Sequence, residues 1–95
     1  MEIKILDVRL QNNGKPLKAF VDINFDGLGI RDFRVIQQPG HKAYVVAPQT
    51  AWKGQQGKPN FKPIISMPNA VKWQIESAIL TEYQRAKEGS NERPI

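Results

Sequence analysis

The segment from Leu17 to Phe25 constrains the fold most, because an apolar residue occupies every second position along it. Side chains of a β-strand point alternately to opposite faces, so this pattern predicts a strand with one buried face. Asn13-Gly14 precedes the segment and Asp26-Gly27 follows it, and both pairs favour tight hairpin turns. The sequence therefore predicts an antiparallel partner strand on each side of this segment.

Three further apolar segments are predicted strands, separated from one another and from Leu17–Phe25 by short turns. They are Ile3–Leu10, where Leu6, Val8 and Leu10 share one phase, Ile30–Ile36, with apolar residues in both phases, and Ala43–Ala47 after the turn Pro39-Gly40. Residues 49–60 contain two glycines and a proline, and they are predicted to form a loop. Phe61–Met67 is predicted as a short further strand, which Pro63 restricts to a sheet edge.

The periodicity changes to that of a helix after Asn69. Six apolar positions recur at helical spacing and form one stripe: Val71, Ile75, Ala78, Ile79, Tyr83 and Ala86. The predicted helix runs from about Ala70 to Lys87, with Asn69 or Ser66 as its N-cap and Gly89 where it stops.

These elements predict an α+β fold, an antiparallel meander of four or five strands with one C-terminal helix. Residues 1–88 would form a single domain and residues 89–95 a flexible tail. One helix covers only one face of a sheet, and Ile30–Ile36 and Ala43–Ala47 are apolar in both phases, so a homodimer is expected to cover the other face. Trp73 and Leu80 lie just off the helical stripe and either join that interface or widen the core stripe.

Positive charge is concentrated in the middle of the chain. The net charge is +5 and the pI about 9.8, and no acidic residue occurs from Phe33 to Ile75. Segregated charge of one sign indicates an anionic partner.

The predicted loop combines cations with aromatic rings. Lys53, Lys58 and Lys62 can contact phosphates, and the interleaved rings of Trp52 and Phe61 offer faces on which unpaired bases can stack. Arg34 and Lys42 would assist from the sheet. DNA, RNA or both are the expected partners, and single strands suit this combination particularly. The alternative is a flexible, lysine-solubilised loop with Trp52 packed against the sheet.

Other classes of function find no support in the residues. The chain has no cysteine and one histidine, His41, and no nucleophile or phosphate-loop motif. Asp22–Gly27 begins like a calcium-binding EF-hand loop, but Phe33 occupies the position of the bidentate glutamate. The aspartates are expected to face solvent or to pair with Arg9, Arg31 and Arg34. We therefore expect no enzyme activity, cofactor, metal or small-molecule substrate. The sequence shows neither a membrane span nor a signal peptide, so a cytoplasmic protein is expected.

Several blocks across roughly residues 3–86 resemble the SpoVG family (stage V sporulation protein G, septation protein). They are Asp7-Val8-Arg9-Leu10, Leu17-Lys18-Ala19-Phe20 with Val21-Asp22-Ile23, Ile30–Ile36, Val46-Ala47-Pro48, Pro63-Ile64 and Ala78–Gln84. The resemblance implies a bacterial, dimeric DNA-binding and in some cases RNA-binding protein that regulates sporulation, septation, cell division or transcription.

The chain departs from the family pattern directly after Pro48. Thr50 and Ala51 stand where the family has an adjacent basic pair, and positive charge returns only at Lys53, Lys58 and Lys62. The resemblance therefore implies nucleic-acid binding through a displaced basic cluster. The alternative function is a protein-interaction module of the division or regulatory machinery, docking through Phe61–Met67 or through the helix face of Trp73 and Leu80.

Overall fold

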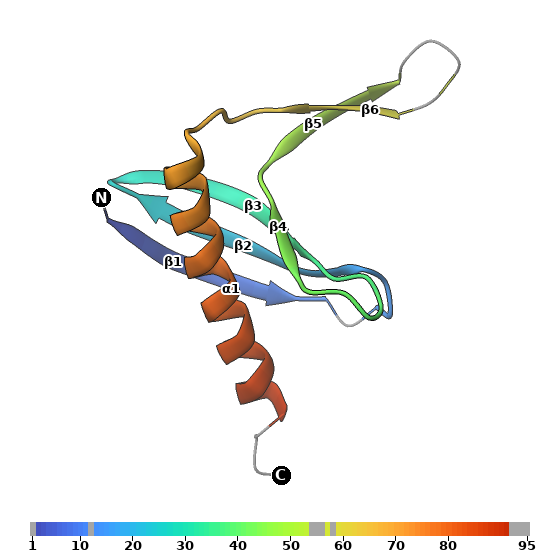
Figure 1. Cartoon of the computed structure of the whole chain (residues 1–95), viewed down its shortest axis with the longest axis vertical. Coiled ribbons are helices and arrows are strands. Elements are labelled where there is room, and N and C mark those ends of the chain that lie inside the picture. The colour runs from blue at the N-terminus through green and yellow to red at the C-terminus, as the bar shows by residue number, and fades with distance from the viewer. Residues whose placement is uncertain (1, 12, 54–56, 58, 92–95) are drawn as a thin grey trace.

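The computed structural model describes residues 2–11, 13–53, 57 and 59–91. Its main sheet has four antiparallel strands in sequential order: β1 (Ile3–Leu10), β2 (Leu17–Phe25), β3 (Leu28–Ile36) and β4 (Tyr44–Val46). A single helix, α1 (Asn69–Asn91), lies across one face of this sheet (Figure 1). The predicted α+β meander with a C-terminal helix is confirmed.

The hydrophobic core lies between the sheet and α1. The apolar stripe of the helix packs against alternate residues of β2, the second half of β3 and Val45 of β4. The buried residues are Ala19, Val21, Ile23, Phe33, Val35, Val45, Ile75, Ile79 and Tyr83. The period-two pattern of β2 and the helical stripe therefore identified the two sides of the core correctly.

A break in the register between β1 and β2 changes which residues of β1 face the helix. Ile5 pairs with Ile23 but Asp7 pairs with Asp22, so Leu6 is an extra residue. Leu6 is 59% exposed, whereas Val8 and Leu10 pack against the core. The prediction that Leu6 shares their phase is wrong, because a bulge shifts the alternation by one residue.

A second bulge explains the mixed apolar pattern of β3. Ile30 pairs with Ile23 and Phe33 pairs with Val21, which leaves one residue too many on β3. Asp32 within this bulge has a φ of 66°, a left-handed conformation that aspartate tolerates better than most residues. Ile30 and Phe33 therefore both pack on the helix side. Their opposite phases reflect the bulge and do not indicate that both faces of β3 are covered.

The segment predicted as a loop contains strands. β5 (Gln49–Lys53) and β6 (Pro59–Pro63) pair antiparallel in a separate two-stranded sheet. Both strands of such a sheet are edges, which agrees with the position expected for Pro63. The apolar pattern missed β5 because a separate two-stranded ribbon does not require the alternation that marks a half-buried strand.

The ends of α1 differ from those expected. The carbonyl of Pro68 accepts the first helical hydrogen bond from Lys72 N–H, at 3.0 Å, so Pro68 takes the cap position rather than Asn69 or Ser66. The helix continues past Lys87 to Asn91 and includes Gly89. In the described part of the chain no helix is both long and apolar enough to cross a membrane.

Candidate nucleic-acid interface

β5 and β6 form an arm that projects from the body of the molecule (Figure 1). The two strands contact chiefly each other, from Gln49 opposite Pro63 to Lys53 opposite Pro59. At the base, Ile64 N–H donates a hydrogen bond to the carbonyl of Pro48 at 3.2 Å, which closes the ladder. Each strand of the arm therefore has one edge that pairs with no other strand of the described chain.

The register divides the arm into two sets of alternating positions, which belong to opposite faces of a pleated ladder. Lys53 falls in the set with Phe61, and Lys62 falls in the set with Trp52. Lys58 lies outside the described residues. The predicted basic cluster is thus divided between both sets of positions and does not form a single row.

Of the two basic residues predicted to assist from the sheet, Arg34 is the one beside the base of the arm. It pairs with Val46 on β4, two residues before Pro48, and it is exposed. Its guanidinium carbon lies 5.8 Å from the centre of the Phe20 ring, within the range of a cation–π contact. Arg9, Phe20, Arg34 and Val46 form one row across all four strands, on the sheet face opposite α1, which we call the open face.

Lys42 is exposed, but it lies before β4, at the end of that strand away from the arm. A strand of three residues spans about 10 Å. The structure therefore brings Arg34 to the base of the arm and leaves Lys42 beside the opposite end of the sheet.

The aspartates of the open face, Asp7, Asp22 and Asp32, gather around Arg9, whose single charge neutralises them in part. Its guanidinium donates to Asp22 at 2.8 and 3.0 Å, to Asp7 at 2.7 Å and to Asp32 at 2.9 Å. These bonds confirm the predicted pairing for Arg9, whereas Arg31 and Arg34 form no ion pair among the described residues.

This arginine–carboxylate network shifts the pKa values of its central members. Hydrogen bonding to Asp22 and Asp7 raises the pKa of Arg9. The hydrogen bonds from Arg9, followed by the backbone N–H of Asp32 at 3.0 Å, lower the pKa of Asp22. Asp22 is thus held as a carboxylate by an arginine within a strand, which is not the arrangement of an EF-hand loop. The described residues contain no group of three or more His, Cys, Asp or Glu placed to hold a metal.

Trp73 and Leu80 have different environments on α1. Trp73 is 65% exposed, whereas Leu80 is half-buried and packs against the core. Both line a shallow hollow on the outer side of the helix, together with Ser77. Leu80 therefore widens the core stripe, and Trp73 does not.

Two aromatic residues near the basic positions are exposed, of which Phe61 belongs to the predicted combination of cations and rings and Tyr44 does not. Phe61 of β6 is 58% exposed and Tyr44 of β4 is 48% exposed. Phe61 has polar neighbours in the sequence, Asn60 and Lys62, which is the signal of a solvent-facing aromatic, whereas Tyr44 lies in an apolar run that gives no such signal. The candidate interface consists of the arm with Trp52, Lys53, Phe61 and Lys62, together with Arg34 at its base. Comparison with protein-family models, curated proteins and solved structures finds no match to this chain.

Proposed function

We propose that this chain is a nucleic-acid-binding regulatory protein of the SpoVG type, acting in the cytoplasm on DNA, RNA or both. The observation that carries the proposal is the projecting β5–β6 arm, which lies within a stretch of sequence free of acidic residues. A two-stranded ribbon is narrow enough to enter the major groove of B-DNA.

The distribution of charge on the open face also supports the proposal. The aspartates gather around Arg9 on β1, β2 and β3, where their charge is partly neutralised. Arg34 lies in the neighbouring part of the same face, next to the arm, and has no carboxylate partner among the described residues. An approaching phosphate therefore meets the positive charge of Arg34 beside the arm.

A homodimer is part of the proposal, because two arms double the number of phosphate contacts. We expect Trp73→Ala to lower the association constant of the dimer at least about fivefold, as measured by sedimentation equilibrium. The side chain is 65% exposed within one chain, so the melting temperature measured at low concentration should scarcely change. Unchanged association would place the dimer contact elsewhere.

The first test is a salt titration of binding. Each protomer that neutralises about three phosphates would give a dimer whose log K falls with log salt at a slope of roughly −5 on duplex DNA, and less steeply on single strands. Fluorescence anisotropy of labelled duplex DNA, single-stranded DNA and RNA measures the slope and the preferred strand. Steep salt dependence would support the proposal.

The alternative function makes the opposite prediction. A protein-interaction module docking through exposed apolar side chains such as Phe61 and Ile64 would bind its partner with weak salt dependence. Absence of nucleic-acid binding at low salt by the folded protein would refute the proposal and favour partner capture.

A further inference from the structure

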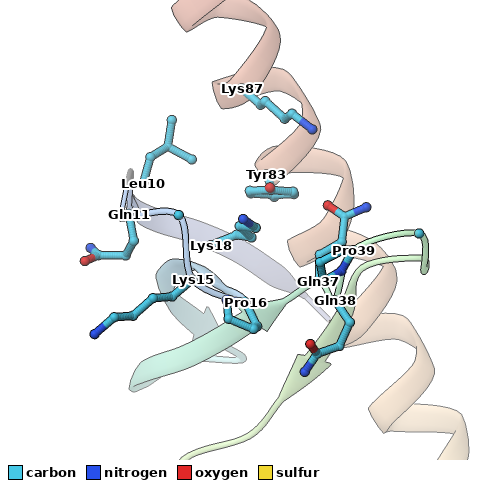
Figure 2. Close-up of a pocket in the computed structure, with 12 residues that line it drawn as sticks. Leu10, Gln11, Lys15, Pro16, Lys18, Gln37, Gln38, Pro39, Tyr83 and Lys87 are labelled. Atoms are coloured by element: carbon cyan, nitrogen blue, oxygen red, sulfur yellow. The ribbon is translucent and has the colours of Figure 1, made fainter.

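A second cationic feature lies at the opposite end of β4 from the arm. The β1–β2 turn and the β3–β4 turn, joined by a hydrogen bond from Gln37 N–H to the carbonyl of Pro16 at 2.9 Å, form the floor of a cavity beneath the C-terminal half of α1 (Figure 2). Its volume is about 830 Å³, within the range of small-molecule sites.

The lining of this cavity is cationic and contains no acidic residue among those described. Lys15 and Lys18 reach it from the β1–β2 turn and the start of β2, and Lys87 reaches it from α1. Figure 2 shows the Tyr83 ring between Lys18 and Lys87. The ammonium group of Lys87 lies 6.0 Å from the centre of that ring, and Lys15 extends outward at the rim.

Lys18 shows that the positive charge is more than a solubilising surface. It is half-buried, and neither it nor Lys15 nor Lys87 has a carboxylate within salt-bridge distance among the described residues. A partly buried lysine without a counter-charge is placed to receive an anionic ligand, because an anion compensates for the water that burial removes.

The remaining lining indicates the kind of anion. Gln11, Gln37 and Gln38 place amide groups around the cavity, and these groups can donate hydrogen bonds to phosphate or hydroxyl oxygens. Tyr83 is 3% exposed and contributes an apolar ring beside the two lysines. Because the cavity is larger than an isolated phosphate needs, it has room for a ligand in which an uncharged moiety is attached to the charged group.

We propose that this cavity is a binding site for a small molecule bearing a diphosphate or triphosphate group, such as a nucleoside diphosphate. Lys18 and Lys87 bind the phosphate groups, Lys15 assists from the rim, and the glutamine amides contact the body of the ligand. The site is concave and is separated from the arm by β4, so it is independent of the proposed nucleic-acid interface.

The test uses the full chain and four probes: ADP, pyrophosphate, inorganic phosphate and adenosine. Two-dimensional ¹H–¹⁵N NMR titration at low salt should give saturable shifts centred on residues 10–18, 37–40 and 83–87. ADP should bind with a Kd of about 1 mM or tighter, pyrophosphate more weakly, and adenosine not at all. Lys18→Gln with Lys87→Gln should weaken ADP binding at least about tenfold.

The matched control is Lys4→Gln with Lys72→Gln, which removes the same charge from exposed lysines that do not line the cavity. The control should bind ADP as the wild type does, and both double variants should retain nucleic-acid affinity within about threefold. Equal weakening of ADP binding in both double variants, or no saturable shift up to about 10 mM ADP, would overturn the proposal. Neither result would bear on the arm, because nucleic-acid binding is measured separately.

Discussion

Replacing Lys53, Lys58 and Lys62 together by glutamine is expected to weaken nucleic-acid binding about a hundredfold at about 50 mM salt. Each lysine that no longer contacts a phosphate removes one released counterion, so the slope of log K against log salt should flatten by about 3 per protomer on duplex DNA. Anisotropy titrations of wild type and variant over the same salt series measure both quantities. Sequence preference, where one exists, should be retained, because phosphate contacts position a protein without reading bases.

The matched control for this prediction is a triple replacement of Lys4, Lys72 and Arg85 by glutamine. It removes the same net charge from exposed side chains on β1 and α1. If the arm is the interface, the control should bind within about threefold of wild type. Equal losses in the two variants would mean that diffuse positive charge, and not the arm, attracts the nucleic acid.

The register makes a finer distinction within the arm. Lys53 and Lys62 belong to alternate sets of positions, so a ligand that contacts only one face of the ribbon would depend on one of them. A ribbon inserted into a groove would depend on both, and each single replacement by glutamine should flatten the salt slope by about 1 per protomer. The two single variants therefore separate docking on one face from insertion.

The parts of the fold that bury a face were predictable from the sequence. β2 and α1 each present one continuous apolar row to the other, and their periodicities follow directly from strand and helix geometry. Bulges were not predictable in this way, since an extra residue such as Leu6 looks like any other member of an apolar run. Its consequence appeared only when pairing with β2 was known.

The candidate site was less predictable than the core. The basic and aromatic residues of the arm could be selected by type, but their strands could not, because a two-stranded ribbon does not require an alternating apolar pattern. Lys42 is close to the arm in sequence and was therefore grouped with the arm lysines, but β4 separates it from the arm. The cavity below α1 was missed for the same reason: Lys18 and Lys87 are distant in sequence and meet only through the packing of the helix on the sheet.

Asp22→Ala is expected to lower the free energy of unfolding by about 2 kcal/mol, and the melting temperature by about 10 °C. The Asp22 side chain is 16% exposed. It accepts two hydrogen bonds from Arg9, at 2.8 and 3.0 Å, and one from the backbone N–H of Asp32 at 3.0 Å. The substitution leaves the backbone N–H of Asp32, in the β3 bulge, without its acceptor. Asp32 already has an unfavourable φ of 66°. Thermal and urea denaturation followed by circular dichroism measure the loss.

The pH dependence of this loss distinguishes the charge of Asp22 from its packing. The pKa of Asp22 is lower in the folded state than its ordinary value of 3.8, so the ionised group contributes stability above that value and loses it as the pH falls through the folded pKa. The difference between wild type and Asp22→Ala should therefore be constant from about pH 7 to pH 5 and shrink below about pH 4. Asp7→Ala is the control, because Asp7 has the same arginine partner but a side chain that is 54% exposed, and it should cost about 0.5 kcal/mol or less. Equal losses in the two variants, or a loss independent of pH, would show that the carboxylate of Asp22 does not hold the bulge through its charge.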